Sequence, residues 1–361
     1  MTVISLLIVN YRSAALAADA IRTARATTRM PLQAVVVDNT LDPAEAEALR
    51  AHADIVIAAP SNRGYSGGIN LGRPHCQGDV LVVSNPDVVF ADGCLDRLAE
   101  ALDKRTAVAG PAFFWDDAHE WRLPPADLSS GWDKLDEVLA SRAASWRAER
   151  DRRRFRKRVQ FWSLRETTHV DALSGAVMAI RAADFDAVDG FDERFPLYYE
   201  EIDFVRRLAE RRRKVAYVPD ARCRHIFDQS AGQAAEEAAQ RYAQSELRYL
   251  EKWNGPFAAR TLKKLEKPVQ VAATFTEGRG LAVPRPDETV VEVSPLPSFA
   301  TAAGHFPKGE WVELPEEITK SFRRGALYLR TVQRLTGEVF ATVKISPDGF
   351  DQRHGADPAQ R

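Results

Sequence analysis

The sequence is poor in cysteine and has no close pair of cysteines. Its three cysteines, Cys76, Cys94 and Cys223, are widely separated along the 361-residue chain. Structural zinc sites and small disulfide scaffolds need cysteines at short, paired spacings. The sequence therefore argues against both kinds of site, and it is compatible with a reducing cytoplasm.

Long apolar runs and an excess of charge of one sign are also missing. The apolar run from Val3 to Val9 is short and follows no basic region, and no later segment approaches the ~20 apolar residues of a transmembrane helix. The 50 Lys and Arg residues are balanced by 51 Asp and Glu, so no global field attracts nucleic acid. We expect a cytoplasmic protein without nucleic-acid partners, whose contact with the inner face of the plasma membrane would be peripheral.

The first half of the chain alternates short β-branched runs with helical segments. Val3–Val9 is almost continuously apolar, and an alanine-rich helical pattern follows from Ala14 to Ala26. Repeated strand and helix units predict an α/β fold, with a mainly parallel, Rossmann-like sheet flanked by helices. The other expected strands cover residues 33–37, 54–58 and 79–83, and a further helix covers residues 94–102.

Polar side chains follow each of these expected strands. Because ligands bind outside the carboxyl ends of parallel strands, we expect the polar side chains to converge on one ligand site. The simpler interpretation is that loops between strands and helices are polar because they are solvated. The residues are Asn10 and Arg12, Asp38 and Asn39, Ser61 and Asn62, and Asn85 and Asp87.

A glycine-rich stretch runs from Ser61 to Gly72. Its glycines allow a close approach of the backbone to a ligand at the start of a helix, which suits a phosphate or ribosyl hydroxyls. The stretch has neither the Gly-Lys-Ser/Thr of a Walker loop nor the glycine spacing of a dinucleotide site after the first strand. By itself it does not identify the ligand.

Three carboxylates, Glu200, Glu201 and Asp203, crowd into four positions. Like charges this close repel one another unless they are solvated, neutralised by arginine or held for chemistry. One interpretation is the acidic first turn of a helix, with Arg206 and Arg207 as local partners. The other is that one of the three is a general base.

Residues 142–158 contain nine Arg or Lys side chains against two acids. Such a run forms either a solvated helical face or a patch that binds anionic lipid headgroups or a polyphosphate acceptor. The sequence leaves both interpretations open.

The character of the chain changes beyond Pro256. A long helical pattern over residues 233–253 stops at Asn254-Gly255-Pro256, and later segments read as strands separated by Pro and Gly turns. We expect a domain over residues 1–255, a connector over 256–268, a smaller β-rich accessory domain over 269–350 and a disordered tail over 351–361. The expected strands are Val269–Phe275, Thr289–Val293, Trp311–Leu314, Ala326–Val332 and Glu338–Ile345, the last two forming a hairpin across residues 333–337.

Seven segments within residues 2–253, in this order, resemble the inverting family 2 nucleotide-sugar glycosyltransferases of GT-A fold. The likeness is to the rhamnosyltransferase-like and galactofuranosyltransferase-like branch, whose members build bacterial surface polysaccharides. It implies a GT-A domain that transfers one sugar from a nucleotide donor to a glycan or lipid-linked acceptor. The matching segments are Ile8-Val9-Asn10-Tyr11, Val36-Val37-Asp38-Asn39, Asn62-Arg63-Gly64-Tyr65 with Asn70-Leu71-Gly72, Asn85-Pro86-Asp87, Ser174-Gly175-Ala176, Gly190-Phe191-Asp192-Glu193 with Tyr198 to Asp203 and Arg207, and His225.

For the donor site, the resemblance implies nucleotide contacts at the carboxyl ends of the strands. Asp38 would read the pyrimidine base, with Asn10 and Arg12 beside the nucleotide. Asp87 would ligate a Mg²⁺ or Mn²⁺ ion that bridges the two phosphates, with His225 as a second ligand, and an oxygen-rich site of this kind suits such ions. A structural role for His225 is the alternative. The other implied donor-site residues are Asn62, Gly64, Asn70, Asn85, Gly175 and Glu200.

For the acceptor side, the resemblance places the general base in the acidic stretch. Glu201 is the expected base and Asp203 the alternative, because relatives usually carry Asp at the position of Glu201. dTDP-L-rhamnose is the first expected donor, and a UDP-linked hexose or galactofuranose is the next. The β-rich domain could bind the acceptor, form a homodimer or cover the active site.

Three other functions stay open at this point. The same fold could glycosylate a peptide, a natural product or a soluble small molecule from a UDP-sugar. Glu201 and Asn85, which stand where relatives carry Asp, would also suit a non-catalytic nucleotide-sugar-binding protein. A nucleotidyltransferase shares the sheet and the metal, but it would release pyrophosphate instead of a nucleoside diphosphate.

Overall fold

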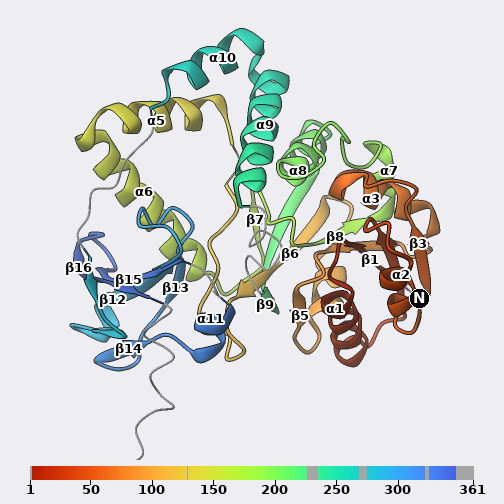
Figure 1. The fold of residues 1–361 in the computed structure, drawn as a ribbon, viewed down its shortest axis with the longest axis horizontal. Helices are drawn as coiled ribbons and strands as arrows, with labels where there is room; N and C mark the ends of the chain where they lie inside the picture. The colour runs from red at the N-terminus through yellow and green to blue at the C-terminus, as the bar shows by residue number, and fades with distance from the viewer. Residues whose placement is uncertain (1, 128, 226–234, 268–274, 322–324, 347–361) are drawn as a thin grey trace, which may run out of the picture.

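Two main sheets make up the fold. The computed structural model describes residues 2–127, 129–225, 235–267, 275–321 and 325–346. The larger sheet lies on the right of Figure 1, and the smaller, C-terminal sheet lies on the left with helix α6 alongside it.

The larger sheet has nine strands within the described ranges, in the order β3-β2-β1-β4-β8-β6-β9-β5, with β7 also paired to β9. Its strands are β1 (Ile4–Asn10), β2 (Leu32–Asp38), β3 (Ile55–Ala58), β4 (Val80–Ser84), β5 (Val88–Phe90), β6 (Thr106–Phe114), β7 (Thr168–Val170), β8 (Val177–Arg181) and β9 (Lys214–His225).

The strands β3, β2, β1 and β4 pair in parallel, which confirms the strands expected from the first half of the chain. Every residue of β1 and β4 is buried. Continuous apolar runs are typical of parallel strands covered by helices on both faces. The carboxyl ends of these four strands point to one edge of the sheet, so the polar residues that follow them share that edge.

The remaining strands make the sheet mixed. β8 runs antiparallel to both β4 and β6, whereas β9 runs parallel to β6 and antiparallel to β5 and β7. The predicted α/β class is confirmed, with this antiparallel half as an addition. Buried apolar runs mark where strands lie but not their direction, since both orientations bury the same side chains.

Helices cover both faces of the larger sheet. On one face, called the α4 face below, α1, α2 and α4 bury residues such as Ile21 and Leu98. On the other, called the α8 face, α3, α7 and α8 bury residues such as Ile69, Phe185 and Phe204. These helices are α1 (Ala14–Thr27), α2 (Pro43–Arg50), α3 (Gly64–Gly72, followed by the 3₁₀ turn Arg73–His75), α4 (Cys94–Glu100), α7 (Ala182–Ala187) and α8 (Glu200–Glu210).

Four further helices lie between the two sheets along the chain or beside them. In Figure 1, α5 and α10 lie side by side at the top and α9 descends from them towards α8. The predicted connector over residues 256–268 therefore contains a helix. None of the helices in the described ranges has the length and apolarity needed to cross a membrane. The four are α5 (Gly131–Arg142), α6 (Ala144–Trp162), α9 (Ala235–Asn254) and α10 (Pro256–Leu265).

The C-terminal sheet has five strands within the described ranges, in the order β10-β16-β15-β12-β13, beside the pair β11-β14. β15 and β16 form the predicted hairpin. Of the predicted strand Val269–Phe275 only its last residue is described, and the predicted tail over 351–361 lies outside the described residues. The elements are β10 (Thr276–Glu277), β11 (Gly280–Ala282), the 3₁₀ turn Pro286–Glu288, β12 (Thr289–Ser294), β13 (Ala303–His305), β14 (Trp311–Glu313), α11 (Glu316–Ser321), β15 (Leu327–Gln333) and β16 (Val339–Ile345).

The C-terminal sheet shares its core with the chain between β6 and β7. Phe155 and Trp162 of α6 pack against Val290 and Val332, and Trp121 packs into the core on the far side of the sheet. Burying such aromatic side chains stabilises a fold by roughly 1.5–3 kcal/mol each. The two halves of the chain are therefore joined by apolar packing, while the domain boundaries drawn from the sequence stay a prediction.

A buried charge cluster reinforces this junction. Glu292 of β12 is fully buried, and its Oε1 accepts hydrogen bonds from Nε and Nη2 of Arg158 at 2.9 and 2.6 Å. Its Oε2 accepts from Nε and Nη2 of Arg330 at 2.8 and 2.6 Å. The two hydrogen bonds from Arg158 tie α6 to β12, and those from Arg330 of β15 satisfy the other carboxylate oxygen.

Candidate active site

The acidic stretch forms the first turn of α8. Tyr198 and Tyr199, directly before it, have φ angles of 68° and 70°. The left-handed region costs a non-glycine residue on the order of 1–3 kcal/mol, and such strain is concentrated at active sites. The surrounding fold thus holds the chain in a strained path where Glu200 and Glu201 enter the helix.

Glu200 and Glu201 share a dry environment. Their Oε2 atoms are buried and have no hydrogen-bond partner in the described part of the chain. Burial, and then the charge of Glu201, raises the pKa of Glu200 well above its usual value. Burial also raises the pKa of Glu201, but the backbone N–H groups of Glu201 and Ile202 oppose this rise. Both shifts disfavour the charged form, and the two N–H groups beside Glu201 favour its carboxylate.

Tyr65 and Gly175 line this carboxyl pair. The Tyr65 hydroxyl donates to the carbonyl oxygen of Gly175 at 3.3 Å, and burial followed by the charges of Glu200 and Glu201 raises the pKa of Tyr65. A Cβ on Gly175 would lie 3.3 Å from Cβ and Cγ of Glu201, so glycine permits this close approach. Gly175 was expected in the site, whereas Tyr65 was not, although it belongs to the matching segment Asn62–Tyr65.

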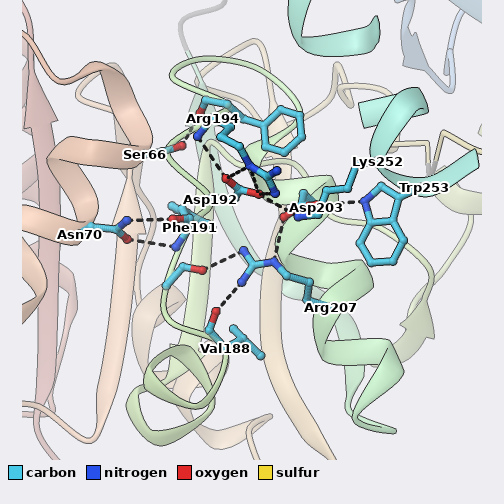
Figure 2. A network of polar contacts seen from close by, with 12 residues as sticks. Ser66, Asn70, Val188, Phe191, Asp192, Arg194, Asp203, Arg207, Lys252 and Trp253 are labelled. Atoms are coloured by element: carbon cyan, nitrogen blue, oxygen red, sulfur yellow. Dashed lines mark hydrogen bonds and ion pairs between the residues drawn. The ribbon is translucent and has the colours of Figure 1, made fainter. Parts of the chain in front are cut away.

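Asp203 has a different set of partners (Figure 2). It is fully buried, its Oδ2 accepts from Nε of Arg207 at 2.8 Å, and its Oδ1 accepts from the indole N–H of Trp253 at 2.9 Å. Nζ of Lys252 lies 2.6 Å from the same Oδ1. Both oxygens of Asp203 are thus occupied by donors, whereas Oε2 of Glu201 has no hydrogen-bond partner in the described part of the chain. This geometry favours Glu201 over Asp203 as the base.

The same network ties α8 to the loop before it. Arg207 donates from Nη1 to the carbonyl oxygen of Val188 at 2.5 Å and from Nη2 to that of Gly190 at 2.8 Å. Lys252 of α9 also donates to Asp192 at 2.8 Å. Burial opposes ionisation of Asp192, but hydrogen bonds from Arg194 and Lys252 hold its pKa below the usual range. In Figure 2 these donors and carboxylates connect α8, α9 and the loop in one group.

The glycine-rich stretch forms α3 and holds the far end of that loop. Asn70 donates from Nδ2 to the carbonyl oxygen of Phe191 at 2.8 Å and accepts the N–H of Phe191 at 3.0 Å. Ser66 Oγ donates to the carbonyl oxygen of Phe195 at 2.5 Å. The side chain of Asn70, expected to border the nucleoside, thus holds the loop that carries the acidic stretch.

Gly64 is the first residue of α3, at a position where the neighbouring chain leaves no space for a side chain. It has a φ of 69°, and a Cβ there would lie 2.5 Å from the carbonyl oxygen of Pro196. Asn62 Oδ1 accepts the N–H of Gly64 at 2.9 Å, and Asn39 Nδ2 donates to its carbonyl oxygen at 2.8 Å. Only glycine suits both the backbone conformation and the close contact.

Asn10 and Asp38 meet at the carboxyl ends of β1 and β2. Asn10 Nδ2 donates to Asp38 Oδ1 at 2.8 Å and to Glu45 Oε2 at 3.0 Å, and Thr40 also donates to Asp38 Oδ1. Oδ2 of Asp38 makes no hydrogen bond within the described ranges. Asn10 therefore orients Asp38 and leaves one carboxylate oxygen to accept a hydrogen bond from a ligand. Arg12 lies exposed at the same edge.

Asp87 and His225 face each other where β5 pairs with β9. Oδ1 of Asp87 lies 3.3 Å from Nε2 of His225, and both side chains are largely buried. A carboxylate oxygen beside an imidazole nitrogen fits a divalent ion such as Mn²⁺. Asn85 directly follows β4, and its backbone N–H donates to the carbonyl oxygen of Ala176. The described residues contain no group of three or more His, Cys, Asp or Glu side chains that could hold a metal.

The predicted residues thus occupy one edge of the larger sheet in three groups. They are the Glu200–Glu201 pair, the Asn10–Asp38 pair and the Asp87–His225 pair. A surface pocket lined by residues such as Arg29 and Asp96 lies at the opposite edge, beside the start of β1, and takes no part in this arrangement.

The basic run over residues 142–158 forms most of α6, and its charges are largely paired. Asp127, Asp136 and Glu149 form ion pairs along its length, and Arg158 is bound by Glu292. Paired charges attract anionic lipid less strongly than the run of basic residues implies, and membrane contact through this helix stays a prediction. The partners of the three acids are Arg154 and Lys157, Arg150 and Arg153, and Arg152 and Arg156, respectively.

Comparisons with known proteins find relatives among glycosyltransferases. Among curated proteins, the chain is 26% identical over 225 residues to the N-acetylglucosaminyl-diphospho-decaprenol L-rhamnosyltransferase of Mycobacterium tuberculosis (strain ATCC 25618 / H37Rv), covering 57% of this chain and 70% of that protein. It is 26% identical over 176 residues to the rhamnosyltransferase WbbL of Escherichia coli (strain K12), covering 48% of this chain and 61% of that protein.

Among solved structures, the mannosyltransferase PcManGT of Pyrobaculum calidifontis, in complex with GDP-Man and Mn²⁺, aligns with a TM-score of 0.46 at 13% identity, covering 72% of this chain and 69% of that one. Residues 2–244, well over half of the chain, match the family model described as Glycosyltransferase like family 2. This protein therefore belongs to glycosyltransferase family 2, and its mixed α/β sheet is that of a GT-A fold.

Proposed function

We propose that this enzyme is a metal-dependent inverting glycosyltransferase that moves L-rhamnose from dTDP-L-rhamnose to a bacterial surface-polysaccharide or lipid-linked glycan acceptor. The observation that carries the reaction type is the buried, unpaired Oε2 of Glu201 at the first turn of α8. The choice of sugar is supported by the two curated relatives, both named as rhamnosyltransferases. A UDP-linked hexose or galactofuranose is the second candidate donor.

The reaction is a single displacement at the anomeric carbon. Glu201 accepts the proton of an acceptor hydroxyl through its free carboxylate oxygen, and the hydroxyl oxygen forms a bond to the anomeric carbon. The bond from that carbon to the phosphate oxygen breaks on the opposite side, and the nucleoside diphosphate leaves with the electron pair. The configuration inverts, and no covalent enzyme intermediate is needed.

The donor is held at the strand ends. Asp38, oriented by Asn10, offers its free oxygen to the N–H of the pyrimidine base. Asp87 and His225 would hold a Mg²⁺ or Mn²⁺ ion, whose charge would offset that of the leaving diphosphate. Tyr65 and Gly175 shape the space beside the base, so the sugar and the acceptor hydroxyl meet near Glu201.

The raised pKa of Glu201 predicts a pH dependence of transfer. The base works only when ionised, and burial moves its ionisation to a higher pH than that of an exposed glutamate. We expect kcat/KM to fall on acidification, with a midpoint clearly above 4.5, the value for an ordinary glutamate. Initial rates across a pH series measure this, and a profile that stays flat down to pH ~4.5 would contradict it.

A thermal-shift panel tests the donor assignment. The protein would be mixed with dTDP, UDP, GDP and their sugars, with and without Mg²⁺ or Mn²⁺, because ligands that bind the native state raise the melting temperature. We expect stabilisation by dTDP or dTDP-L-rhamnose that requires the metal and disappears in Asp87→Ala. The exposed Asp79→Ala, at the opposite edge of the sheet, is the matched control and should respond like the unmodified protein.

Other outcomes of the panel and a product analysis overturn specific parts of the proposal. Stabilisation by UDP alone would replace rhamnose with a UDP-sugar as donor. No response to any nucleotide would contradict a donor site. Release of pyrophosphate from the bound donor, in place of a nucleoside diphosphate, would identify a nucleotidyltransferase.

A further inference from the structure

Four arginines from separate segments gather where the two sheets meet. Arg122 follows β6, and its backbone bridges Phe114 on one side and Gly304 of β13 on the other. We call the group the arginine cluster, and its members are Arg122, Arg165 after α6, Arg222 of β9, and Arg334 in the turn between β15 and β16.

Aromatic rings lie between two of these arginines, and the other two lie nearby. The guanidinium carbons of Arg122 and Arg334 lie 6.0 and 5.2 Å from the centre of the Phe306 ring, and Arg122 lies 5.2 Å from that of Phe114. Burial, then the charge of Arg165 and also that of Arg222, lowers the pKa of Arg122. The geometry places both neighbours near Arg122. Arg222 pairs with Ala112, two residues before Phe114, and Trp162, which accepts a hydrogen bond from Arg165, donates to the carbonyl oxygen of Leu123.

The guanidinium of Arg122 has no hydrogen-bond or ion-pair partner among the described residues, and it is half-buried. None of its five N–H donors has a protein acceptor in the described part of the chain. Asp116, which attracts it electrostatically, is fully buried, and its carboxylate already accepts the N–H groups of Glu120 and Trp121. Asp116 therefore does not bind Arg122 directly.

The other cluster members are also poorly neutralised. Arg165 donates from Nη1 to the carbonyl oxygens of Trp162 and Leu164, and Arg334 donates to the hydroxyl of Ser163 at 3.3 Å. Arg222 lies 3.9 Å from Asp220, at the limit of an ion pair. The basic residues of α6, in contrast, are matched by acids. Like charges held together without counter-charges destabilise the fold unless an anion joins them.

We propose that the arginine cluster binds a phosphate or diphosphate group of the acceptor substrate. Planar guanidinium groups bind phosphate oxygens in pairs, and half-burial strengthens each such contact relative to open water. This assignment rests on the proposed transferase function. It concerns the acceptor because the donor diphosphate is assigned to Asp87 and His225, which are different residues.

The position of the cluster suits an acceptor. Cys223 of β9 packs into the core of the α4 face, so the alternation of side chains along a strand puts Arg222 on the α8 face. Glu201 belongs to the helix that covers the α8 face. A ligand lying along that face can place a hydroxyl near Glu201 while its phosphate reaches the cluster at the junction with the C-terminal sheet.

The binding test uses inorganic pyrophosphate in EDTA at low ionic strength, followed by calorimetry. We expect Arg122→Gln to weaken pyrophosphate binding roughly 10- to 100-fold, the loss of one charge-assisted pair of hydrogen bonds. Arg165→Gln should also weaken it. Asp87→Ala and the exposed Arg285→Gln should bind like the unmodified protein. Melting without ligand verifies that each variant is folded.

The outcomes separate this inference from the donor assignment. Equal binding by Arg122→Gln and the unmodified protein would overturn the site, and so would loss of binding in Asp87→Ala. The kinetic arm compares acceptors with and without a phosphate group. Arg122→Gln should raise KM roughly 10-fold or more for the phosphate-bearing acceptor alone. A rise in KM for the nucleotide sugar instead would assign the anion to the donor. Because calorimetry measures pyrophosphate binding directly, it tests the arginine cluster even if the enzyme transfers no sugar.

Discussion

Glu201→Gln is expected to lower kcat for sugar transfer by roughly 10²–10⁴-fold, the usual contribution of a general base. The amide keeps the shape of the side chain but cannot take up the proton of the attacking hydroxyl group. Since the carboxylate Oε2 of Glu201 is buried without a hydrogen-bond partner, the substitution breaks no bond to that atom. The KM for the nucleotide sugar and the melting temperature should therefore stay close to those of the unmodified enzyme.

Glu200→Gln provides the matched control for this experiment. Glu200 lies beside the base, and burial and the charge of Glu201 raise its pKa, which favours the protonated form that an amide resembles. We expect a far smaller loss of kcat than for Glu201→Gln and an acid limb close to that of the unmodified enzyme, because burial, the cause that raises the pKa of Glu201, stays in place. A larger loss in Glu200→Gln than in Glu201→Gln would exchange the roles of the two residues.

Asp203→Ala is expected to lower the free energy of unfolding by about 3–5 kcal/mol, because removing one partner of a buried ion pair leaves the others uncompensated. Arg207 and Lys252 would lose the carboxylate that they share, and Trp253 would lose its hydrogen-bond acceptor. Urea unfolding followed by tryptophan fluorescence measures the change.

The exposed ion pair between Asp19 and Arg22 supplies the control for stability. Asp19→Ala should change the free energy of unfolding by no more than about 1 kcal/mol, as expected for surface pairs. If Asp203→Asn kept the stability of the unmodified protein while losing transfer activity as completely as Glu201→Gln, the base would be Asp203, and the positioning role argued from Figure 2 would be wrong.

The basic run in α6 shows why local composition could not predict which arginines have acidic partners. From the sequence, residues 142–158 could equally be a solvated face or a lipid-binding patch. In the fold, Asp127 and Asp136 approach this helix from other segments and pair with its arginines and lysine, and Glu292 comes from the C-terminal sheet. The arginines that lack such partners, with Arg122 as the central example, are isolated along the sequence and form no visible run.

The glycine-rich stretch gives a similar lesson for the site. Its composition suggested contacts with a ligand, and the requirement for glycine at position 64 is real, since φ is 69° and a Cβ would meet Pro196. The side-chain amide of Asn70, however, forms hydrogen bonds with the backbone of Phe191. A polar residue in a ligand-like motif can hold another loop, and only contacts between distant segments distinguish the two roles.

Short-range patterns were enough to locate β1, β2, β3 and β4, the helices α1 and α4, and the C-terminal hairpin, because burial and turn chemistry act over a few residues. Motif order was enough to assign the family. Neither could distinguish Glu201 from Asp203, which differ by two positions in the sequence. Asp203 is neutralised by Lys252 and Trp253 of α9, whereas Glu201 is left dry and unpaired beside Tyr65 and Gly175. Burial and partners set the ionisation of a carboxyl group, and both come from segments that only folding brings together.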